Sequence, residues 1–377
     1  MRSVGIVGGG QLGRMLIQAG IDLDLHVKVL DAKPDSPCAG IAHEFVVGSV
    51  REAESIESFA EGVEILTIEL EDVSVEGLLR AAAKGVEVYP APQVLSVIQD
   101  KGRQRAWYAS QGFPSPRFQL WMPGETVEIP FPLIQKAFQG GYDGKGVQRA
   151  PSAERLWQKP SLLEEEISIY KELSVIVARS KQGEVRAFPV VESVFHPEAH
   201  VVEFLRVPAE IPSHVEKEAR EIAMQMAVSL NIIGLLAVEF FYSTSGQLYV
   251  NEAAPRPHNT GHITIKACWT SQFEQHWRAL LGLPLGETRL HSYGALLNIL
   301  GPVEKSGKVR FPKLTEWLEV PGVSVHLYGK RFSKPFRKLG HIIILAESPQ
   351  ELLQRVGQVR SNLSIEIVPF EMDETFS

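Results

Sequence analysis

Residues 239–252, EFFYSTSGQLYVNE, are the most informative stretch of this chain. Two runs rich in aromatic and branched residues flank the turn-forming residues 243–246, a pattern that predicts a β-hairpin. If the loop has four residues, Glu239 pairs with Val250, and Glu252 lies diagonally opposite on the same face, roughly 7–8 Å away at the backbone. Two carboxylates with phosphate oxygens are a common way to hold Mg²⁺. The stretch therefore predicts a magnesium site, although a three-residue loop would put the acids on opposite faces.

The ten residues that follow are dense in polar chemistry. Arg256, His258, Asn259 and His262 come soon after Glu252 and stand among prolines. Binding and catalytic residues tend to lie on loops of this kind. The alternative is a surface hairpin with two solvated acids. It is the weaker interpretation, because both acids stand among apolar residues, where an unpaired charge is costly.

Composition limits the class of protein. At 377 residues, with 44% apolar and 22% charged residues, the chain is expected to be a soluble globular protein of two or three domains. The net charge of −7 and the lack of a long basic run argue against a nucleic-acid partner. No apolar run is long enough to span a bilayer, so no membrane partner is expected. Cys38 and Cys268 are far apart, which disfavours a disulfide framework and fits a reducing cytoplasm.

Residues 1–95 alternate between strand and helix signals. This alternation predicts a parallel sheet with right-handed crossovers. The expected strands are 3–7, 26–30, 44–47, 65–68 and 86–89, and the expected helices are 11–19, 52–60 and 75–83. One further helix is predicted from residue 93 to residue 111, between two proline-rich segments.

The remaining sequence predicts two more units. Residues 117–189 carry short strand signals, Pro- and Gly-rich loops and a helix near 153–158, which indicates a small α+β lobe. A long amphipathic helix over 213–230 precedes the hairpin, and a helix over 270–281 follows it. The tail is expected to form strands 294–299, 323–327 and 341–345 and a helix over 349–359. We therefore predict three domains, 1–98, 99–190 and 191–377.

Residues 8–13, GGGQLG, match Gly-x-Gly-x-x-Gly between a predicted strand and a predicted helix. Backbone N–H groups at the start of a helix suit an anion such as a phosphate. Asp31 ends the next predicted strand, where a dinucleotide-binding fold places the acid that holds a ribose. We rank phosphate or substrate binding first, an NAD-dependent oxidoreductase second and a plain tight turn third.

A second glycine-rich stretch, residues 140–146 (GGYDGKG), follows a predicted strand that ends at Lys136. Four glycines in seven residues favour a flexible lid whose backbone approaches a ligand closely. Lys136 and Lys145 would meet phosphate charge. The stretch is not a Walker A loop, because no Gly-Lys-Ser/Thr opens a helix here. The alternative is a mobile surface turn, which the two lysines and the enclosed Tyr142-Asp143 pair disfavour.

Two charged runs each have two interpretations. Residues 162–167, LLEEEI, could lie at an interdomain hinge and pair their backbone with an adenine edge, or they could form a solvated face. The basic cluster, defined here as Lys330, Arg337 and Lys338, could receive an anionic group of a substrate or could serve solubility. In an acidic protein, substrate binding is the favoured interpretation of the basic cluster.

Four motifs together resemble a known family over essentially the whole chain. They are residues 8–15 (GGGQLGRM), 140–146 (GGYDGKG), 251–262 (NEAAPRPHNTGH) and 337–341 (RKLGH). The chain resembles the ATP-grasp superfamily and, within it, the N5-carboxyaminoimidazole ribonucleotide synthetases of purine biosynthesis. The resemblance implies an α/β and α+β fold, with a Rossmann-like N-terminal parallel-sheet domain and a two-lobed ATP-binding region. It also implies a cytoplasmic homodimer.

The resemblance implies an ATP-dependent carbon–nitrogen ligase. ATP would phosphorylate bicarbonate to carboxyphosphate, and the amine of 5-aminoimidazole ribonucleotide would take up the carboxyl group, leaving ADP and phosphate. One alternative is the formate-dependent glycinamide ribonucleotide transformylase, another ATP-grasp enzyme, which forms formyl phosphate. A nucleotide-binding regulator without catalysis is a further alternative.

Residue roles follow from the resemblance. Mg²⁺ would be held by Glu239 and Glu252. ATP would be held through its phosphates by Lys101 and Lys136, and through its adenosine by Glu164, Ile167 and Glu172. Bicarbonate and carboxyphosphate would be surrounded by Tyr142, Asp143, Gly144, Lys145, Arg256, His258, Asn259 and Lys338. The ribonucleotide would be received by Gln11, Leu12, Glu69, Lys330 and Arg337. Either His258 or Asp143 could handle the amine proton.

The chain departs from the family pattern at three places. Residues 137–139 (AFQ), before the lid, are less cationic than the pattern. Many ATP-grasp enzymes carry an Asn as a further metal ligand where this chain has Ala254. Val147 stands where the lid pattern has Gln. The two glutamates would therefore hold the metal without an amide ligand two residues further on.

Overall fold

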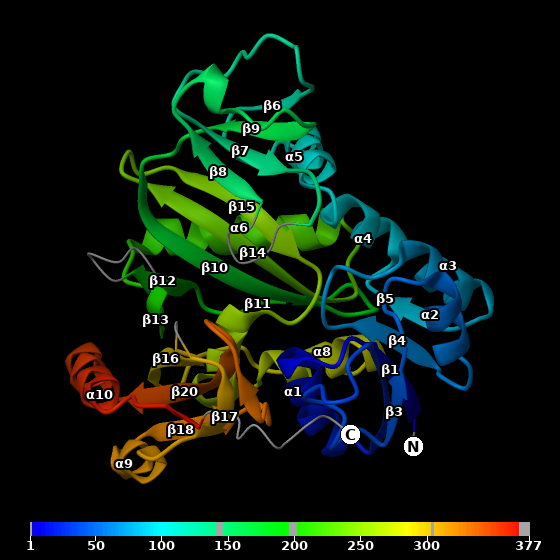
Figure 1. Cartoon of the computed structure of the whole chain (residues 1–377), viewed down its shortest axis with the longest axis vertical. Coiled ribbons are helices and arrows are strands. Elements are labelled where there is room, and N and C mark those ends of the chain that lie inside the picture. The colour runs from blue at the N-terminus through cyan, green and yellow to red at the C-terminus, as the bar shows by residue number, and fades with distance from the viewer. Residues whose placement is uncertain (1, 141–145, 196–201, 303–304, 369–377) are drawn as a thin grey trace.

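The computed structural model describes residues 2–140, 146–195, 202–302 and 305–368. Residues 141–145 of the predicted lid lie outside these ranges, among them the predicted site residues Tyr142, Asp143, Gly144 and Lys145. Within the described ranges, the strands form sheets of five, nine, four and three strands. Figure 1 shows the four-stranded sheet (β6–β9) at the top, the five-stranded sheet at the lower right, and the nine-stranded sheet extending from the middle to the lower left.

The N-terminal sheet is parallel, with the strand order β3-β2-β1-β4-β5. The parallel sheet predicted for residues 1–95 is therefore confirmed. Its strands are β1 Arg2–Val7, β2 Leu25–Asp31, β3 Glu44–Val47, β4 Ile65–Ile68 and β5 Glu87–Tyr89. The helices that alternate with them are α1 Gln11–Ile21, α2 Ala53–Phe59 and α3 Val75–Ala83. The four residues of β4 are all buried, as expected for a central parallel strand covered on both faces.

The single helix predicted over 93–111 is wrong. The chain forms two helices here, α4 Pro92–Ile98 and α5 Lys101–Ser110. Asp100 adopts an extended backbone between them, and its carboxylate accepts a 2.9 Å hydrogen bond from the backbone N–H of Arg103. An aspartate in this N-cap position starts a new helix. The break sets the direction of α5 and thereby the position of Lys101 at its first turn.

The small lobe is a four-stranded antiparallel sheet in the order β6-β9-β7-β8. Its strands are β6 Phe118–Trp121, β7 Leu133–Ala137, β8 Val147–Ala150 and β9 Ser161–Glu165. The helix predicted near 153–158 is only a single 3₁₀ turn, η1 Ala153–Arg155. The turn ends because Leu156 is buried in the core of the lobe, and Pro160 disfavours helical backbone at the residue before it.

The nine-stranded sheet joins the predicted hairpin to the C-terminal tail. Its order is β15-β14-β10-β12-β13-β16-β20-β18, with β11 paired to β10. Its strands are β10 Ile169–Arg179, β11 Val185–Ala187, β12 Val191–Phe195, β13 Val202–Val207, β14 Gly234–Ser243, β15 Leu248–Ala254, β16 Tyr293–Leu300, β18 Val323–Leu327 and β20 Lys338–Ala346. The remaining elements are η2 Asn259–Ile263, α7 Thr264–Ala267, β17 Gly307–Arg310, α9 Leu314–Glu319, β19 Phe332–Ser333, α10 Pro349–Ser361 and β21 Glu366–Val368.

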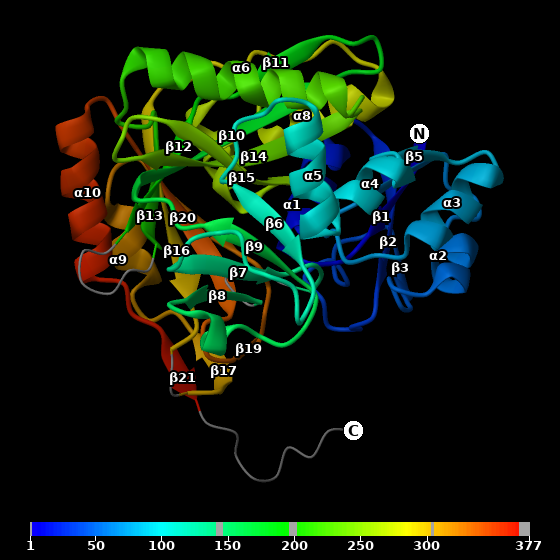
Figure 2. The ribbon, with the colours of Figure 1, turned by 90° about the horizontal axis from the view of Figure 1, so that it is seen from above.

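Two helices cover opposite faces of this sheet. Helix α6 (Ser213–Ser229) packs on one face, where Val175 and Val177 of β10 join its core cluster (Figure 2). Helix α8 (Gln272–Leu281) packs on the other face, where Ile176 and Ala178 lie. Alternate residues of a strand point to opposite faces. The face that carries Ile176 is therefore the face turned toward α8 and the N-terminal domain.

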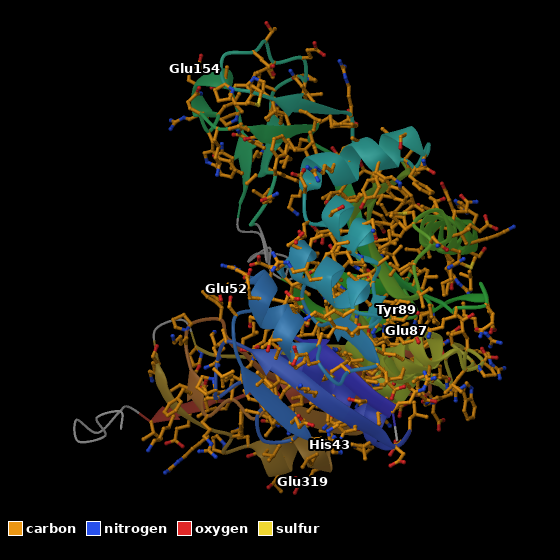
Figure 3. All side chains as sticks on the ribbon, turned by 90° about the vertical axis from the view of Figure 1, so that its right-hand side faces the viewer. His43, Glu52, Glu87, Tyr89, Glu154 and Glu319 are labelled. Carbon is orange, nitrogen blue, oxygen red and sulfur yellow. The ribbon has the colours of Figure 1, made fainter. Side chains whose placement is uncertain are left out.

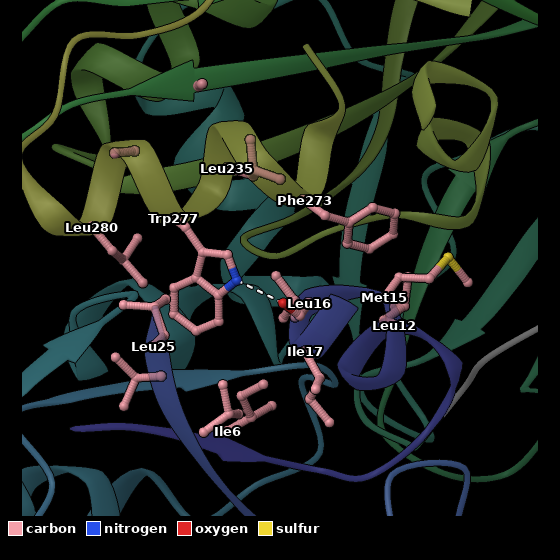
Figure 4. Packing of buried hydrophobic residues seen from close by; sticks show 14 of the residues in the cluster. Ile6, Leu12, Met15, Leu16, Ile17, Leu25, Leu235, Phe273, Trp277 and Leu280 are labelled. Carbon is pink, nitrogen blue, oxygen red and sulfur yellow. Dashed lines mark hydrogen bonds between the residues drawn. The ribbon is translucent and has the colours of Figure 1, made fainter. Parts of the chain in front are cut away.

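The N-terminal domain is fixed to this face through α1 and α8. Trp277 of α8 is fully buried, and its indole N–H donates a 2.8 Å hydrogen bond to the carbonyl of Leu16 (Figure 4). A Cβ atom at Gly20 would lie 3.3 Å from the Trp277 indole nitrogen, so a larger residue there would push the two helices apart by a few tenths of an ångström. This packing sets the start of α1 in a fixed position relative to the nine-stranded sheet.

A second contact joins the two parts at the end of β5. Glu87 forms an ion pair with Lys181 and accepts a 2.7 Å hydrogen bond from the hydroxyl of Tyr89. Figure 3 shows Glu87 and Tyr89 next to each other on this side of the molecule.

Among the described helices, none has the length and apolar content needed to cross a membrane.

Candidate active site

The β14–β15 hairpin sets the two predicted metal ligands face to face. The predicted pairing of Glu239 with Val250 is wrong, because the loop is one residue longer than expected and Phe240 pairs with Val250. A β-bulge then leaves Asn251 as an extra residue, so that Glu239 pairs directly with Glu252. The predicted convergence of the two carboxylates on one face is therefore confirmed, although the register that produces it differs.

The two carboxylates have different surroundings. Glu252 Oε2 accepts a 2.8 Å hydrogen bond from Lys101 Nζ. Burial acts to raise the pKa of Glu252, but the charge and hydrogen bond of Lys101, together with the charge of Lys136, lower it overall. Glu239 Oε1 lies 3.4 Å from His258 Nε2. Burial, followed by repulsion from Glu252 and Glu172, raises the pKa of Glu239. Glu239 is therefore an acid whose negative charge needs a positive neighbour.

A hard divalent cation fits this donor set. Glu172 of β10 is the third acid beside the pair, and burial followed by repulsion from Glu252 raises its pKa. Glu172, Glu239 and Asn251 line one small cavity, which offers several oxygen atoms. In the described ranges, no three His, Cys, Asp or Glu side chains are close enough to hold a metal ion on their own. Phosphate oxygens and water would have to complete the coordination, as is usual for Mg²⁺.

A buried ion cluster lies beside the acids. Arg105 of α5 donates a 2.7 Å hydrogen bond through Nε to Glu164 Oε1, and Lys136 Nζ lies 2.7 Å from Glu164 Oε2. All three residues are buried. Arg105 also donates to the backbone carbonyls of Val250 and Asn251 in the hairpin. The side chain predicted to hold adenosine, Glu164, is therefore occupied as the counter-ion of two cations in this structure.

The other predicted ATP contacts lie at the junction of the two lobes. Lys136 Nζ donates a 3.1 Å hydrogen bond to Asn251 Oδ1, so it bridges the small lobe to the hairpin. Ile167 is half-buried on the short loop between β9 and β10. Burial acts first to lower the pKa of Lys136, while Glu164 acts to raise it. The hinge interpretation of residues 162–167 fits this position, and contact with adenine stays a prediction.

The loop after β15 carries the residues predicted to surround bicarbonate. His258 Nδ1 lies 2.8 Å from Thr260 Oγ1, which in turn lies 2.9 Å from Ser174 Oγ of β10. Burial and the nearby Arg256 lower the pKa of His258 to about 3, so its imidazole is neutral. Asn259 starts η2 beside it. A neutral imidazole has a free acceptor position for a proton, but the lowered pKa makes His258 a weak base until a negative charge lies beside it.

Arg256 joins this loop to the N-terminal domain. Its Nη2 lies 2.7 Å from Glu71 Oε1, just after β4, and its Nη1 donates to the carbonyl of Pro257. Arg256 Nε is buried and has no hydrogen-bond partner in the described residues. A buried unpaired N–H of a guanidinium group is a candidate donor to an anion.

The first glycine-rich loop does not present its amides to a ligand as predicted. The N–H of Gly9 donates a 2.7 Å hydrogen bond to Asp31, and the N–H groups of Gly10 and Gly13 donate to Glu69 at 2.7 and 2.9 Å. The protein's own carboxylates therefore fill the anion position at the start of α1. Asp31 already accepts hydrogen bonds from the backbone N–H groups of Gly9 and Lys33, which weakens the support for NAD binding.

The predicted ribonucleotide residues meet at the start of α1. Lys330 Nζ donates hydrogen bonds to Gln11 Oε1 at 3.1 Å and to the carbonyl of Lys338 at 2.8 Å. Burial, followed by repulsion from Arg337, lowers the pKa of Lys330 to about 8. The structure thus brings Gln11, Lys330 and Lys338 together. Leu12 is different, because its side chain is buried in the core and only its backbone could contact a ligand.

Three residues of this region were not among the residues predicted from the sequence. Arg105 organises the ion cluster, Asn251 holds Lys136, and Glu71 pairs with Arg256. Arg105 stands one helical turn after Lys101, so helical spacing alone placed both on one face of α5. No comparable signal marked Glu71, because its partner is far away in the sequence.

Family models and relatives agree on what this arrangement is. A ribonucleotide synthetase pre-ATP-grasp domain matches residues 1–99, an ATP-grasp domain matches residues 110–273, and a phosphoribosylaminoimidazole carboxylase C-terminal domain matches residues 294–355. The chain is therefore an ATP-grasp protein, as the hairpin acids, the two lysines and the two lobes indicated.

Relatives narrow the class. The chain is 38% identical over 368 residues to the N5-carboxyaminoimidazole ribonucleotide synthase of Mycobacterium tuberculosis (strain ATCC 25618 / H37Rv), covering 93% of this chain and 85% of the relative. The crystal structure of the synthetase from Thermotoga maritima has a TM-score of 0.89, with 36% identity, 98% of this chain covered and 100% of that chain. The chain belongs to the N5-carboxyaminoimidazole ribonucleotide synthase family.

One solved relative bears on the ligands. The enzyme from Aspergillus clavatus was crystallised in complex with ADP and 5-aminoimidazole ribonucleotide. It has a TM-score of 0.84 and 29% identity, with 96% of this chain and 98% of that chain covered. The C-terminal match and these relatives favour the carboxylating family over the formate-dependent transformylase and the oxidoreductase.

Proposed function

We propose that this chain catalyses the ATP- and bicarbonate-dependent carboxylation of 5-aminoimidazole ribonucleotide. The products are N5-carboxyaminoimidazole ribonucleotide, ADP and phosphate. The observation that supports the proposal is that two polar sets lie close together, because the charge of Arg256 acts both on Glu69 at the substrate end and on Glu239 at the metal site. The nucleotide set is Glu239, Glu252, Lys101 and Lys136, and the substrate set is Gln11, Glu69 and the basic cluster. Arg256 and His258 lie between the two sets.

The first step needs little covalent help from the protein. An oxygen of bicarbonate attacks the γ-phosphorus of ATP, the bond to the bridging oxygen breaks, and ADP leaves with that electron pair. Phosphoryl transfer depends mainly on positioning and on neutralising charge. Mg²⁺ held by Glu239 and Glu252 would offset the charge of the phosphate oxygens. Lys101 would move from Glu252 to a phosphate when the nucleotide binds.

The second step joins nitrogen to carbon. Carboxyphosphate loses its phosphate, and the amine nitrogen of the ribonucleotide bonds to the carboxyl carbon. The amine must lose one proton. His258 is neutral and buried between Glu239 and Thr260, so it is the described residue best placed to accept that proton. The carboxylate of Asp143, which lies outside the described residues, is the other candidate from the sequence.

At the substrate end, different residues would bind different parts of the ribonucleotide. The carboxylate of Glu69 already accepts hydrogen bonds from backbone N–H groups at the start of α1. The phosphate of the ribonucleotide would therefore bind at the basic cluster instead. Glu69 itself, fixed by two backbone donors, could accept hydrogen bonds from ribose hydroxyls or from the amine. Its pKa is raised, chiefly by burial.

The test is ADP release from the purified chain with Mg²⁺-ATP. The reaction should require 5-aminoimidazole ribonucleotide and bicarbonate, and labelled bicarbonate should enter an acid-labile product. Replacing bicarbonate by formate, with glycinamide ribonucleotide as acceptor, should give no ADP. ADP formation only in the formate reaction would overturn the proposal, and so would ADP release that is independent of either acceptor.

Three further features are proposed at the level of the whole chain. The domains are 1–98, 99–190 and 191–377, with the first boundary supported by the helix break before Lys101. Cys38 and Cys268 are both free and buried, which fits a reducing cytoplasm. A homodimer is proposed from the family resemblance, and sedimentation of the purified chain would test it.

A further inference from the structure

Three histidines, of which His262 and His341 are buried, lie behind the substrate set and have no part in the proposed reaction. The rings of His262 and His341 stack with centroids 4.7 Å apart at 24°, and those of His341 and His326 stack at 4.6 Å and 9°. His262 and His341 are at most 1% exposed. Two of the motifs that carry the family resemblance end in His262 and His341, and the stack brings these motif ends together.

The stack connects segments that are distant in the sequence. His262 lies in η2, the short helix that begins beside His258. His341 is on β20, three residues after Lys338. His326 is on β18 and lines a groove with Arg14 and Met15 of α1, the helix that begins with Gln11. The loop that carries His258, strand β20 and helix α1 therefore lie together around the three stacked histidine rings.

A directional bond extends the stack toward the basic cluster. Tyr328 Oη lies 2.8 Å from His341 Nδ1, and both groups are buried. The ammonium of Lys330 lies 5.3 Å from the centre of the Tyr328 ring. Lys330 in turn bonds to Gln11. The position of Lys330 thus depends on a ring that His341 orients.

Simple packing does not account for imidazole at this place. His341 Nε2 and both ring nitrogens of His262 are buried without a hydrogen-bond partner in the described residues. Leaving such groups unpaired is costly, and a phenyl ring would stack without that cost. The one feature that a phenyl ring could not supply at position 341 is the Nδ1 atom that meets Tyr328.

We propose that His341 is a positioning residue for the ribonucleotide. Through Tyr328 it orients Lys330, which faces the substrate phosphate. Through its stack on His262 it fixes the loop that carries His258 against the strand that carries Lys338. This inference rests on the proposed function, because it concerns how that function's substrate is held.

The test uses His341→Phe, which keeps an aromatic ring, and Tyr328→Phe, which removes only the hydroxyl. Each variant should raise KM for 5-aminoimidazole ribonucleotide roughly tenfold, the size expected for one lost buried hydrogen bond, and should leave KM for ATP within about twofold. If His341 and Tyr328 act through the same hydrogen bond, KM for the ribonucleotide in the double variant should be no higher than in the more impaired single variant. Binding of the ribonucleotide alone, measured by calorimetry, should weaken in parallel.

His276→Phe is the matched control. His276 is another buried histidine, and its Nε2 lies 2.9 Å from Thr67 Oγ1, a residue that is not in the substrate set. The control should lower the melting temperature to a similar degree without changing KM for the ribonucleotide. Variants at 341 and 328 that behave like the control would overturn the inference, as would equal rises in both KM values.

Failure of the proposed function would look different. A wild-type chain that neither binds the ribonucleotide nor releases ADP in its presence would overturn both the function and the inference. A wild-type chain that is active while Tyr328→Phe is unaffected would overturn the inference alone. Tyr328→Phe removes one atom, so it keeps the test available if His341→Phe fails to fold.

Discussion

Glu239 and Glu252 face each other across β14 and β15 because a bulge at Asn251 shifts the register by one residue. Without the bulge, the length of the hairpin loop would place the two carboxylates on opposite faces. The same bulge leaves the Asn251 side chain beside Lys136. One irregularity in a strand therefore builds the proposed metal site and links it to the small lobe.

Glu252→Gln should abolish turnover while the fold stays intact. Removing one ligand of Mg²⁺ is expected to lower kcat/KM on the order of 100-fold or more. Without Mg²⁺, stability should change little, because relief of the repulsion from Glu239 opposes the loss of the ion pair with Lys101. Added Mg²⁺-ATP should raise the melting temperature of the wild type and not that of the variant. Glu218→Gln, at an exposed position of α6, is the control, and retained activity in Glu252→Gln would contradict the metal assignment.

Glu164→Gln should harm both stability and ATP binding. The change leaves Arg105 and Lys136 buried without their counter-ion, and breaking a buried ion pair costs about 3–5 kcal/mol. Urea unfolding would measure the loss, and KM for ATP should rise more than KM for the ribonucleotide.

The matched control for this cluster is Arg149→Lys. Arg149 pairs with Glu166 on the surface of the same lobe, where its side chain is 57% exposed. Exposed pairs contribute little, so the control should be close to wild type. A Glu164→Gln variant as stable as the control would show that the cluster does not hold the lobes together.

Gly10→Ala should displace Glu69 and weaken ribonucleotide binding. A Cβ atom at this position would lie 2.5 Å from Glu69 Oε1, closer than any real contact. We expect KM for the ribonucleotide to rise severalfold, with KM for ATP unchanged. Gly40→Ala is the control, because no atom lies within 4 Å of a Cβ built there. An unchanged KM in Gly10→Ala would mean that Glu69 does not contact the substrate.

Buried neutral histidines should make the chain sensitive to acid. Burial lowers the pKa of His276 from 6.5 to about 3, so the unfolded state binds this proton more readily than the folded state does. Stability from His276 is complete above pH 6.5 and is lost as pH falls toward 3, at roughly 1.4 kcal/mol per pH unit in between.

Denaturant unfolding of wild type and His276→Phe between pH 7 and pH 4.5 would test this prediction. The variant should be less stable at pH 7 and should lose less stability as the pH falls. His43→Phe is the comparison, since His43 is less buried. Equal slopes for His276→Phe and the wild type would show that His276 does not stay neutral in the fold.

The sequence determined the elements whose signals are local. The strand–helix alternation of residues 1–95 fixed the parallel sheet, and the apolar runs around residues 243–246 fixed the hairpin. Motif residues such as Lys101 and His258 could be named because residue type and spacing carry their chemistry. The sequence also contained a signal for the break at Asp100, because aspartate is a favoured N-cap residue. Its carboxylate accepts a hydrogen bond from the backbone N–H of Arg103, three residues further on.

Tertiary structure decided what depends on partners far away in the chain. Asp31 and Glu69 accept hydrogen bonds from the backbone N–H groups of the first glycine-rich loop. A motif whose N–H groups suit a phosphate therefore binds the protein's own carboxylates. The register of the hairpin depends on a bulge, and the stack of His262 on His341 joins segments 79 residues apart. Local sequence encodes propensity and side-chain chemistry. Which donor meets which acceptor is set by packing, because only the folded chain brings distant groups within hydrogen-bond distance.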